Sequence, residues 1–410
     1  MEDPTSVGTA PLTLAEDASV PALTHEPTRR WLATRGLPAR HRLMSFRPLA
    51  EARVRTVRQH LLDQGPDAGA RADELAEDTA PLLLLGHLLV QGEEADQVVL
   101  DGGTGRVFSL WLYEKDPACA ERFPLAASVE ALAGHLAAVD DFAALRGDFA
   151  DLAGAVGPAA VAEAEARLTA RLTEGEGAGA LPVFWRIAAR IRPLALIAGQ
   201  GPATGLRLDL PRGLLEAEFG EEEIVRLAPA DLPAALEHEP TRRFLMEVGL
   251  PREAGMFGLW EDEYLMRTLK ETEDARSGDD GDSKGDGNRN DSSALPDGAE
   301  RLVCLGSLVH DFEVVIHGAT GRLYHRLYDS AEITPVNADV STLAFTLWLH
   351  QREQRLDETE EFTADFYQYL ADTMSEVLGS VDPVACAPST GDEDYRYWPE
   401  VFHDEAGGVL

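Results

Sequence analysis

The six residues HEPTRR occupy positions 25–30 and occur again at positions 238–243, an offset of 213 residues. The likeness continues in register, since Gly-Leu-Pro follows at 36–38 and again at 249–251. Identity over six residues, followed by three more at the same offset, is not expected by chance. The chain is therefore predicted to be a tandem duplication of one module.

The repeated stretch is typical of the start of a helix. Its proline fits the first helical turn, where the missing N–H leaves no hydrogen bond unmade. Gly36 and Gly249 are placed to end that helix in the left-handed conformation. The Arg-Arg pair could bind an anionic partner, but a solvated helix face is the simpler interpretation. His25 and His238 are expected to begin the helices and not to bind a ligand.

The length of 410 residues suits two domains, and the composition restricts their partners. Thirty-six basic and 72 acidic residues give a formal net charge of −36. Such a chain repels nucleic acid and anionic membranes, so we expect neither as a partner. Basic molecules should be attracted. Hydrophobic residues make up 44% of the chain, which is enough for two packed cores.

The cysteines and the N-terminus indicate the cellular compartment. Cys119, Cys304 and Cys386 are far apart and odd in number, and they predict neither a disulfide framework nor a zinc site. The first 17 residues are acidic and lack the apolar core of a signal peptide. No apolar run reaches the roughly 18–20 residues of a membrane span. We therefore expect a cytoplasmic protein.

Both modules show the same order of predicted elements. After the first helix comes an extended piece that carries Phe46 or Phe257, and then three apolar strands of an antiparallel sheet. A Thr-Gly pair between the second and third strands indicates a hairpin with glycine at positive φ. Helices follow, and each module closes near an aromatic pair that contains Trp185 or Trp398. The strands are expected at 81–90, 97–100 and 106–111, and at 302–309, 312–317 and 322–328; the helices are expected at 124–139 and 159–172, and from 335 and at 361–378.

These elements predict an α+β fold of two tandem modules, each with a central, mostly antiparallel sheet flanked by helices. The first module is expected at 1–198 and the second at 206–410, with a linker at 199–205 that is rich in glycine and contains a proline. The second module starts with a strand near 206–210 and a helix near 214–220, for which the first module shows no counterpart.

Residues 271–298 are expected to be a disordered acidic insertion in the second module. They carry nine acidic and three basic residues and few apolar ones. So little apolar burial cannot offset an ordering cost of about 1–2 kcal/mol per residue. Their net charge of −6 leaves −30 on the rest of the chain, so the acidity belongs mainly to the folded modules.

Several patterns that resemble catalytic or ligand sites fail on their context. The letters GDSKG at 281–285 fit a nucleophile elbow, but they lie in the insertion without the strand and helix that an elbow requires. The aspartates nearby loosely follow a calcium loop, yet Lys284 stands at a ligand position. In the glycine-rich segment 199–205, Pro202 removes an N–H that a phosphate loop would use. We expect no catalytic residue, no cofactor-binding residue, no metal ligand and no cofactor.

Short motifs recur along this order of helix, strand, hairpin and helix. They are the helix that ends in Gly-Leu-Pro, Leu85-Gly86 and Leu305-Gly306, the Thr-Gly turn, and Val336-Asn337 before a helix. Together they resemble the SUKH superfamily, in particular its fourth subfamily of bacterial immunity proteins. The resemblance covers about residues 20–200 and 206–402. The first module has Ala126 where the second has Asn337.

The resemblance implies a non-enzymatic protein that binds and neutralises a secreted polymorphic toxin, often a nuclease or a deaminase, inside the producing cell. An acidic surface agrees with a basic toxin as the partner. Two alternatives stay open: a scaffold or regulatory protein of the same superfamily, and an enzyme whose site is assembled from dispersed residues.

We expect the sheet and its edges to contact the toxin, with aromatic anchors supplying affinity and carboxylates at the rim supplying steering. Each of these charges could instead serve solubility alone. The expected partner-binding residues are Glu93, Glu94, Asp96, Trp111 and Tyr113 in the first module, and Asp311, Glu313, Tyr324 and Tyr328 in the second.

Overall fold

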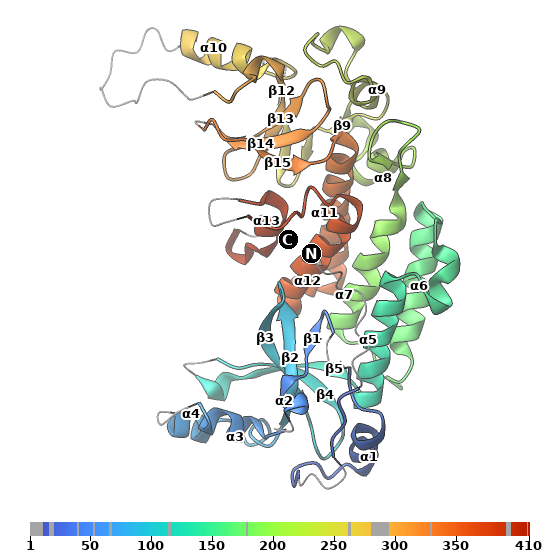
Figure 1. Ribbon diagram of the computed structural model, residues 1–410, viewed down its shortest axis with the longest axis vertical. Helices are drawn as coiled ribbons and strands as arrows, with labels where there is room; N and C mark the ends of the chain where they lie inside the picture. The colour runs from blue at the N-terminus through green and yellow to red at the C-terminus, as the bar shows by residue number, and fades with distance from the viewer. Residues whose placement is uncertain are drawn as a thin grey trace. The chain divides into compact units, whose positions relative to one another are not determined.

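The computed structural model in Figure 1 forms two compact units. One comprises Met1–Ala153, Glu163–Arg190 and Ala364–Tyr369, and the other Gly154–Ala162, Ile191–Thr363 and Leu370–Leu410. Each unit is built around one antiparallel sheet with helices against it, which confirms the α+β prediction. The module boundaries at 198 and 206 stay a prediction. The residues described are 11–15, 20–38, 41–51, 54–64, 68–113, 116–177, 179–260, 264–279, 295–328, 330–390, 395–407 and 409–410.

In the first module, strands β1 to β5 form one antiparallel sheet in sequence order. Apolar residues of α3 and α4, among them Val57, Leu61 and Ala72, pack against Leu84 and Val99 on one face of this sheet. The elements are α1 (Glu26–Thr34), β1 (Met44–Ser45), α2 (Arg47–Ala50), α3 (Val57–Leu62), α4 (Ala68–Glu74), β2 (Leu83–Val90), β3 (Glu93–Leu100), β4 (Val107–Trp111), β5 (Glu121–Ala126), α5 (Val129–Ala143), α6 (Pro158–Thr173) and α7 (Val183–Ile191).

In the second module, strands β10 to β15 form the corresponding sheet, and Leu269 of α10 packs on it against Leu302 and Val315. Figure 1 shows α10 beside β12 and the long α11 below β15. The elements are β6 (Gly199–Gln200), β7 (Leu208–Asp209), α8 (Leu214–Phe219), β8 (Ile224–Val225), α9 (Glu239–Glu247), β9 (Leu250–Pro251), β10 (Glu253–Ala254), β11 (Phe257–Leu259), α10 (Leu269–Asp279), β12 (Leu302–Leu308), β13 (Phe312–His317), β14 (Leu323–Leu327), β15 (Thr334–Asn337), α11 (Val340–Glu360), α12 (Phe362–Val381) and α13 (Tyr397–His403).

The HEPTRR stretch and the Thr-Gly turn are two halves of one contact. The backbone N–H of His25 donates to the carbonyl of Gly102 in the turn (2.7 Å), and its ring lies 2.8 Å from the hydroxyl of Thr28. Gly105 has φ +81°, and a side chain there would collide with both residues. This contact explains why the chain repeats both motifs together. The equivalent residues of the second module, which make the same contacts, are His238, Gly318, Thr241 and Gly321.

The repeated Leu-Gly pair marks a bulge in each sheet. The register of β2 against β3 shifts just before Gly86, and that of β12 against β13 shifts just before Gly306. A side chain at Gly86 would collide with the carbonyl oxygen of Ser45 on β1, and one at Gly306 with that of Gly258 on β11. Glycine is therefore needed where the neighbouring strand approaches.

The structure corrects the expected starts of two helices. The segments with Pro124 and Pro335 are the strands β5 and β15, each at the end of its sheet, and the helices begin at Val129 and Val340. Proline is tolerated in such an edge strand. The true helix starts are marked by the N-cap residues Ser128 and Asp339, whose side chains accept hydrogen bonds from the first turn.

The junction between the sheet and the last helices is built alike in both modules. The indole of Trp185 donates to the carbonyl of Leu125 (2.7 Å), and that of Trp398 to the carbonyl of Val336 (3.1 Å). Asn337 accepts a second bond from Trp398 (3.0 Å), which Ala126 cannot do. The aromatic repeat thus closes the end of each sheet. An acidic residue completes each junction. Glu176 accepts a hydrogen bond from the N–H of Ala127 (3.1 Å), and Asp382 accepts one from the N–H of Ala338 (2.9 Å).

Residues 271–279, expected to be disordered, instead form most of α10. Thr268 and Glu271 make a reciprocal capping pair at its start, as Thr56 and Gln59 do at the start of α3. The helix is therefore the counterpart of α3. Glu273 is 8% exposed, and its carboxylate has a cationic partner in the sheet, Arg326 of β14. The remaining part of the expected insertion, 280–294, lies outside the described residues.

Two further expectations concern the module starts. Leu12 pairs with Leu37 in an isolated bridge, which corresponds to the β8–β9 pair of Val225 and Leu250. The first module therefore keeps part of the N-terminal structure of the second. In the predicted linker, β6 pairs with β7 in a short hairpin, so the segment begins with ordered backbone.

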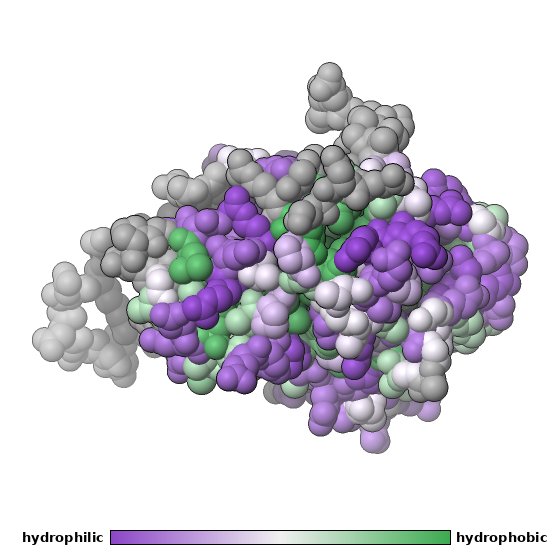
Figure 2. All heavy atoms as spheres, turned by 90° about the horizontal axis from the view of Figure 1, so that it is seen from below, coloured by the Kyte–Doolittle hydropathy of each residue, from purple (hydrophilic) through white to green (hydrophobic). Residues whose placement is uncertain are grey.

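On the face seen in Figure 2, hydrophilic residues cover most of the described area, and hydrophobic residues form small patches between them. Within the described ranges, no helix combines the length and the apolar character that a membrane crossing requires.

Candidate functional site

Most of the expected partner-binding residues lie at the end of each sheet that is opposite the Thr-Gly turn. There β3 begins and β4 ends in the first module, and β13 begins and β14 ends in the second. The structure thus brings together Glu93, Glu94, Asp96, Trp111 and Tyr113 at one sheet end, and Asp311, Glu313 and Tyr328 at the other. Tyr324 lies nearer the turn and packs against the core beneath α10.

In the first module, two aromatic side chains are exposed side by side. Trp111 is 49% exposed and Tyr113 is 40% exposed, and their ring centroids are 6.2 Å apart. Glu121 of β5 is the cross-strand partner of Trp111, and it accepts a hydrogen bond from the hydroxyl of Tyr113 (3.3 Å). We call Trp111, Tyr113 and Glu121 the aromatic patch. Large exposed aromatics beside a carboxylate are suited to bind a cationic protein surface.

The three other predicted carboxylates of the first module differ in environment. Glu93 is exposed. Asp96 is half-buried; burial raises its pKa, opposed by a hydrogen bond from Ser109 (3.1 Å). Glu94 accepts a hydrogen bond from Ser45 (2.7 Å) and lies 3.6 Å from the guanidinium of Arg47. Glu94 therefore already has partners in the chain, whereas Glu93 extends the negative surface.

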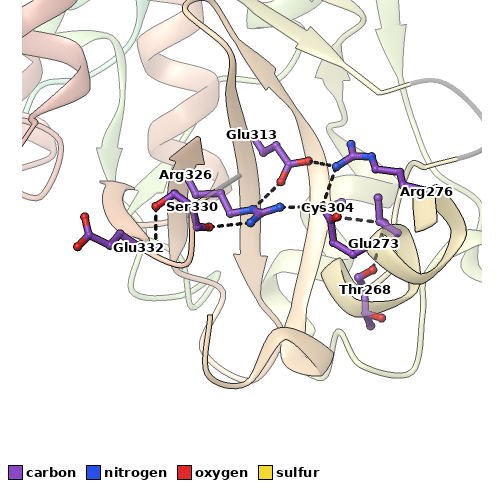
Figure 3. Close-up of polar contacts among 9 residues, drawn as sticks. Thr268, Glu273, Arg276, Cys304, Glu313, Arg326, Ser330 and Glu332 are labelled. Carbon is purple, nitrogen blue, oxygen red and sulfur yellow. Dashed lines mark hydrogen bonds and ion pairs between the residues drawn. The ribbon is translucent and has the colours of Figure 1, made fainter. Parts of the chain in front are cut away.

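In the second module, Glu313 is fully buried in a network of charges (Figure 3). Its carboxylate accepts hydrogen bonds from Arg326 (2.7 Å) and from Arg276 of α10 (3.0 Å). Glu273 of α10 accepts from the same two arginines, at 2.9 Å each. We call these four residues the buried ion network. Two carboxylates and two guanidinium groups balance in charge, so Glu313 is satisfied within the chain.

Aromatic residues surround the outer arginine of this network. The guanidinium carbon of Arg276 lies 5.3 Å from the ring centroid of Trp260, 5.6 Å from that of Tyr264 and 5.4 Å from that of Tyr328. These distances are within the range of cation–π interactions. Tyr328, expected to contact a partner, therefore holds an arginine of its own chain. Asp311 is exposed and has φ +62° in the turn before β13.

Cross-strand register shows what stands at the same place in the first module. Counted from the Thr-Gly turn, the fourth pair of the hairpin is Gln97 with Leu110 in the first module and Glu313 with Arg326 in the second. From the sequence we did not expect Arg326 and Arg276 to bind Glu313, or Glu273 to join them. The capping pattern Thr-x-x-Glu at 268–271 was a signal for the helix that carries two of them.

The other aromatic side chains at this end of the second sheet are packed together. Phe312 is stacked on Tyr395 with ring centroids 5.3 Å apart, and it meets the edge of Tyr397 at 5.7 Å. Leu327 stands at the end of β14, as Trp111 stands at the end of β4, and it is 44% exposed. Thus the second module has an aliphatic side chain where the first has an exposed indole.

Among the described residues, no group of three or more histidine, cysteine, aspartate or glutamate side chains could hold a metal ion. Cys304 is buried beneath α10, and burial raises the pKa of its thiol to about 12. A thiol with that pKa stays protonated near neutral pH and is a poor nucleophile.

The family model described as "SUKH-4 immunity protein" matches residues 5–175 and again residues 210–404. The two matches cover most of the chain and agree with the tandem duplication. No curated protein and no solved structure matches the chain.

Proposed function

The chain belongs to the SUKH-4 immunity protein family, and we propose that it binds a cognate secreted toxin and neutralises it by steric blocking. Immunity by binding needs a complementary surface and no catalytic group. The match of the family model to both modules is the observation that carries this proposal. The protein would act in the cytoplasm of the producing cell, where it meets the toxin before or after secretion.

We further propose that the toxin is basic, of the nuclease or deaminase type. Enzymes that act on nucleic acids present cationic surfaces to phosphates. A chain of net charge −36 would attract such a surface and steer it. The aromatic patch with Glu93 and Asp96 nearby offers both apolar contact and negative charge.

The proposal is tested by co-expression in a bacterium that the toxin kills. The toxin would be sought in the genes adjacent to this one, where an immunity protein is expected to be encoded beside its toxin, with an unrelated immunity protein as control. We expect growth only with the cognate pair, and a stable complex of the two purified proteins. Growth arrest despite a normal level of this protein would contradict immunity and favour a scaffold or regulatory role.

Charge steering has its own test in the association rate. If carboxylates steer a basic toxin, the rate should fall steeply as ionic strength rises to about 0.5 M, where the Debye length is only a few Å. The dissociation rate should change much less. A rate independent of salt, or a toxin that is itself acidic, would contradict the basic partner while leaving immunity intact.

A further inference from the structure

The two modules differ in whether the aromatic side chains at this end of the sheet already hold a cation. In the second module, Trp260, Tyr264 and Tyr328 surround the guanidinium of Arg276. In the first, Trp111 and Tyr113 have no arginine or lysine over their rings among the residues that the structure describes. They are also the only described Phe, Trp or Tyr residues exposed by two-fifths or more.

The carboxylates at the two sheet ends differ in the same way. Glu313 and Glu273 of the second module are 0% and 8% exposed, and each is bound by two arginines. In the first module, Glu121 is exposed, and among the described residues the only hydrogen bond that its carboxylate accepts is the one from Tyr113 (3.3 Å). A cation that approached Trp111 would therefore find two aromatic rings and a carboxylate that is not paired with any arginine or lysine in the described part of the chain.

We infer that the aromatic patch of the first module is the primary toxin-binding site and that it takes an arginine side chain of the toxin, whereas the second module is occupied by its own Arg276. This inference rests on the proposed function for the identity of the partner. The chemistry of the site has a precedent in the same chain. Trp260, Tyr264 and Tyr328, which we call the Arg276 cage, surround the guanidinium of Arg276, and Glu313 accepts a hydrogen bond from it. Arginine suits this site better than lysine, since its planar group stacks on a ring while donating to a carboxylate.

The site can be probed without the toxin by a short peptide of alternating arginine and glycine. Its matched control replaces arginine with citrulline, which keeps the shape and removes the charge. The readout is the indole N–H resonance of Trp111 in the full-length protein, assigned by Trp111→Phe. We expect the arginine peptide to shift this resonance and the citrulline peptide to leave it unchanged. An unshifted Trp111 resonance at saturating peptide would overturn the inference.

Matched variants separate the two modules. Tyr113→Ala should weaken peptide binding about two- to fivefold, the effect of losing one exposed cation–π contact. Leu327→Ala, at the corresponding sheet end of the second module, should leave it unchanged. Equal weakening by both variants would show that the peptide does not select the first module.

A third variant tests whether Arg276 keeps the peptide out of the second module, which we call self-occupancy. Arg276→Ala vacates the cage, so the arginine peptide should then shift the indole resonance of Trp260 as well, which it should not do in the unchanged protein. A Trp260 shift in the unchanged protein would overturn self-occupancy.

Toxin neutralisation then links the site to function. Trp111→Ala with Tyr113→Ala should reduce protection in the co-expression assay, and Leu327→Ala should not. Failure of the unchanged protein to protect would refute the proposed function alone, whereas full protection by the double variant would refute this site alone.

Discussion

The sheet face beneath α3 and α4 and the face beneath α10 occupy the same place in their modules, yet they are stabilised differently. The first is filled by aliphatic side chains such as Leu61, Leu84 and Leu110. The second contains Glu313 and Arg326, both almost fully buried, with the carboxylate of Glu273. What the modules share instead are the residues that shape the backbone, namely the histidine of HEPTRR, the turn glycines and the glycine of the bulge. Duplication thus kept the backbone and changed the chemistry on it.

The largest expected effect comes from breaking the buried ion network on one side. Arg326→Leu places the residue of the first module in the second and leaves Glu313 with one cation fewer. We expect a loss of about 3–5 kcal/mol in the free energy of unfolding, measured by denaturant titration of the full chain. Adding Glu313→Gln should recover much of it, because Glu273 and Arg276 then still balance.

The control for this comparison is Arg122→Leu, which breaks the more exposed pair with Asp78. It should cost less than about 1 kcal/mol. If Arg326→Leu costs no more than this control, or if the double variant is less stable than the single one, the network is not what holds α10 to the sheet.

The acidic residue at the sheet–helix junction gives the next largest effect, and it should differ between modules. Asp382 accepts hydrogen bonds from Asn337 (3.1 Å), from Ala338 and from Val384 (3.1 Å). Among the backbone groups that the structure describes, Glu176 accepts only the N–H of Ala127. We expect Asp382→Ala to cost about 3 kcal/mol and Glu176→Ala about 1–2 kcal/mol. Equal losses in thermal unfolding would mean that the extra bonds in the second module add nothing.

A smaller and opposite effect is expected at Glu353, where the matching residue of the first module is Phe142. Glu353 is fully buried in α11, and burial raises the pKa of its carboxyl from 4.5 to about 8. The folded protein therefore binds more protons than the unfolded chain between these values, and its free energy of unfolding falls as pH rises through this window. Glu353→Gln should remove that slope.

The pKa difference sets an upper bound of about 3 kcal/mol for the gain from Glu353→Gln at pH 7. We expect a gain of about 1–2 kcal/mol, because the buried amide keeps a desolvation cost of its own. Glu358→Gln, on an exposed position of the same helix, is the control and should leave the pH dependence unchanged. An unchanged slope in Glu353→Gln would show that this carboxyl finds a partner in solution.

The smallest effect at neutral pH belongs to His135, which stands where the second module has Thr346. It is fully buried beside Trp185, and burial lowers the pKa of its imidazole from 6.5 to about 4. The unfolded chain therefore binds more protons between these values, so stability falls as pH drops through that window. His135→Thr should raise the free energy of unfolding by about 1–2 kcal/mol at pH 5 and leave it unchanged at pH 8, so that the loss of stability in acid becomes smaller. His310→Gln, at a more exposed position, is the control. If His135→Thr loses as much stability in acid as the unchanged protein does, another group causes that loss.

Part of this fold could be predicted because its signals are local. The Thr-Gly turn, the glycine that ends the HEPTRR helix and the alternation of apolar residues each depend on a few neighbouring positions. Even so, Pro124 and Pro335 were misassigned to helices, since a proline is compatible both with a first helical turn and with an edge strand. Only the sheet pairing distinguishes the two.

The sequence indicated the sheet ends at which most of the candidate residues lie, but not the environment of each side chain. That these residues bind a partner stays a prediction. Trp111 and Tyr113 are exposed, as an anchor requires, whereas Glu313 and Tyr328 are engaged by arginines of the same module. The spacing of charged residues along a strand does not reveal this, because Arg276 comes from a helix 37 residues away in the sequence.

The sequence by itself determined the duplication, the α+β class, the order of the sheet strands in each hairpin and the acidic character of the protein. Tertiary structure decided which charges are buried in pairs and which remain available to a partner. Backbone preferences are set by adjacent residues, so they can be read along the chain. The burial of Glu313 depends on which helix covers its sheet and on an arginine that the neighbouring strand supplies, and such contacts between distant segments exist only once the chain has folded.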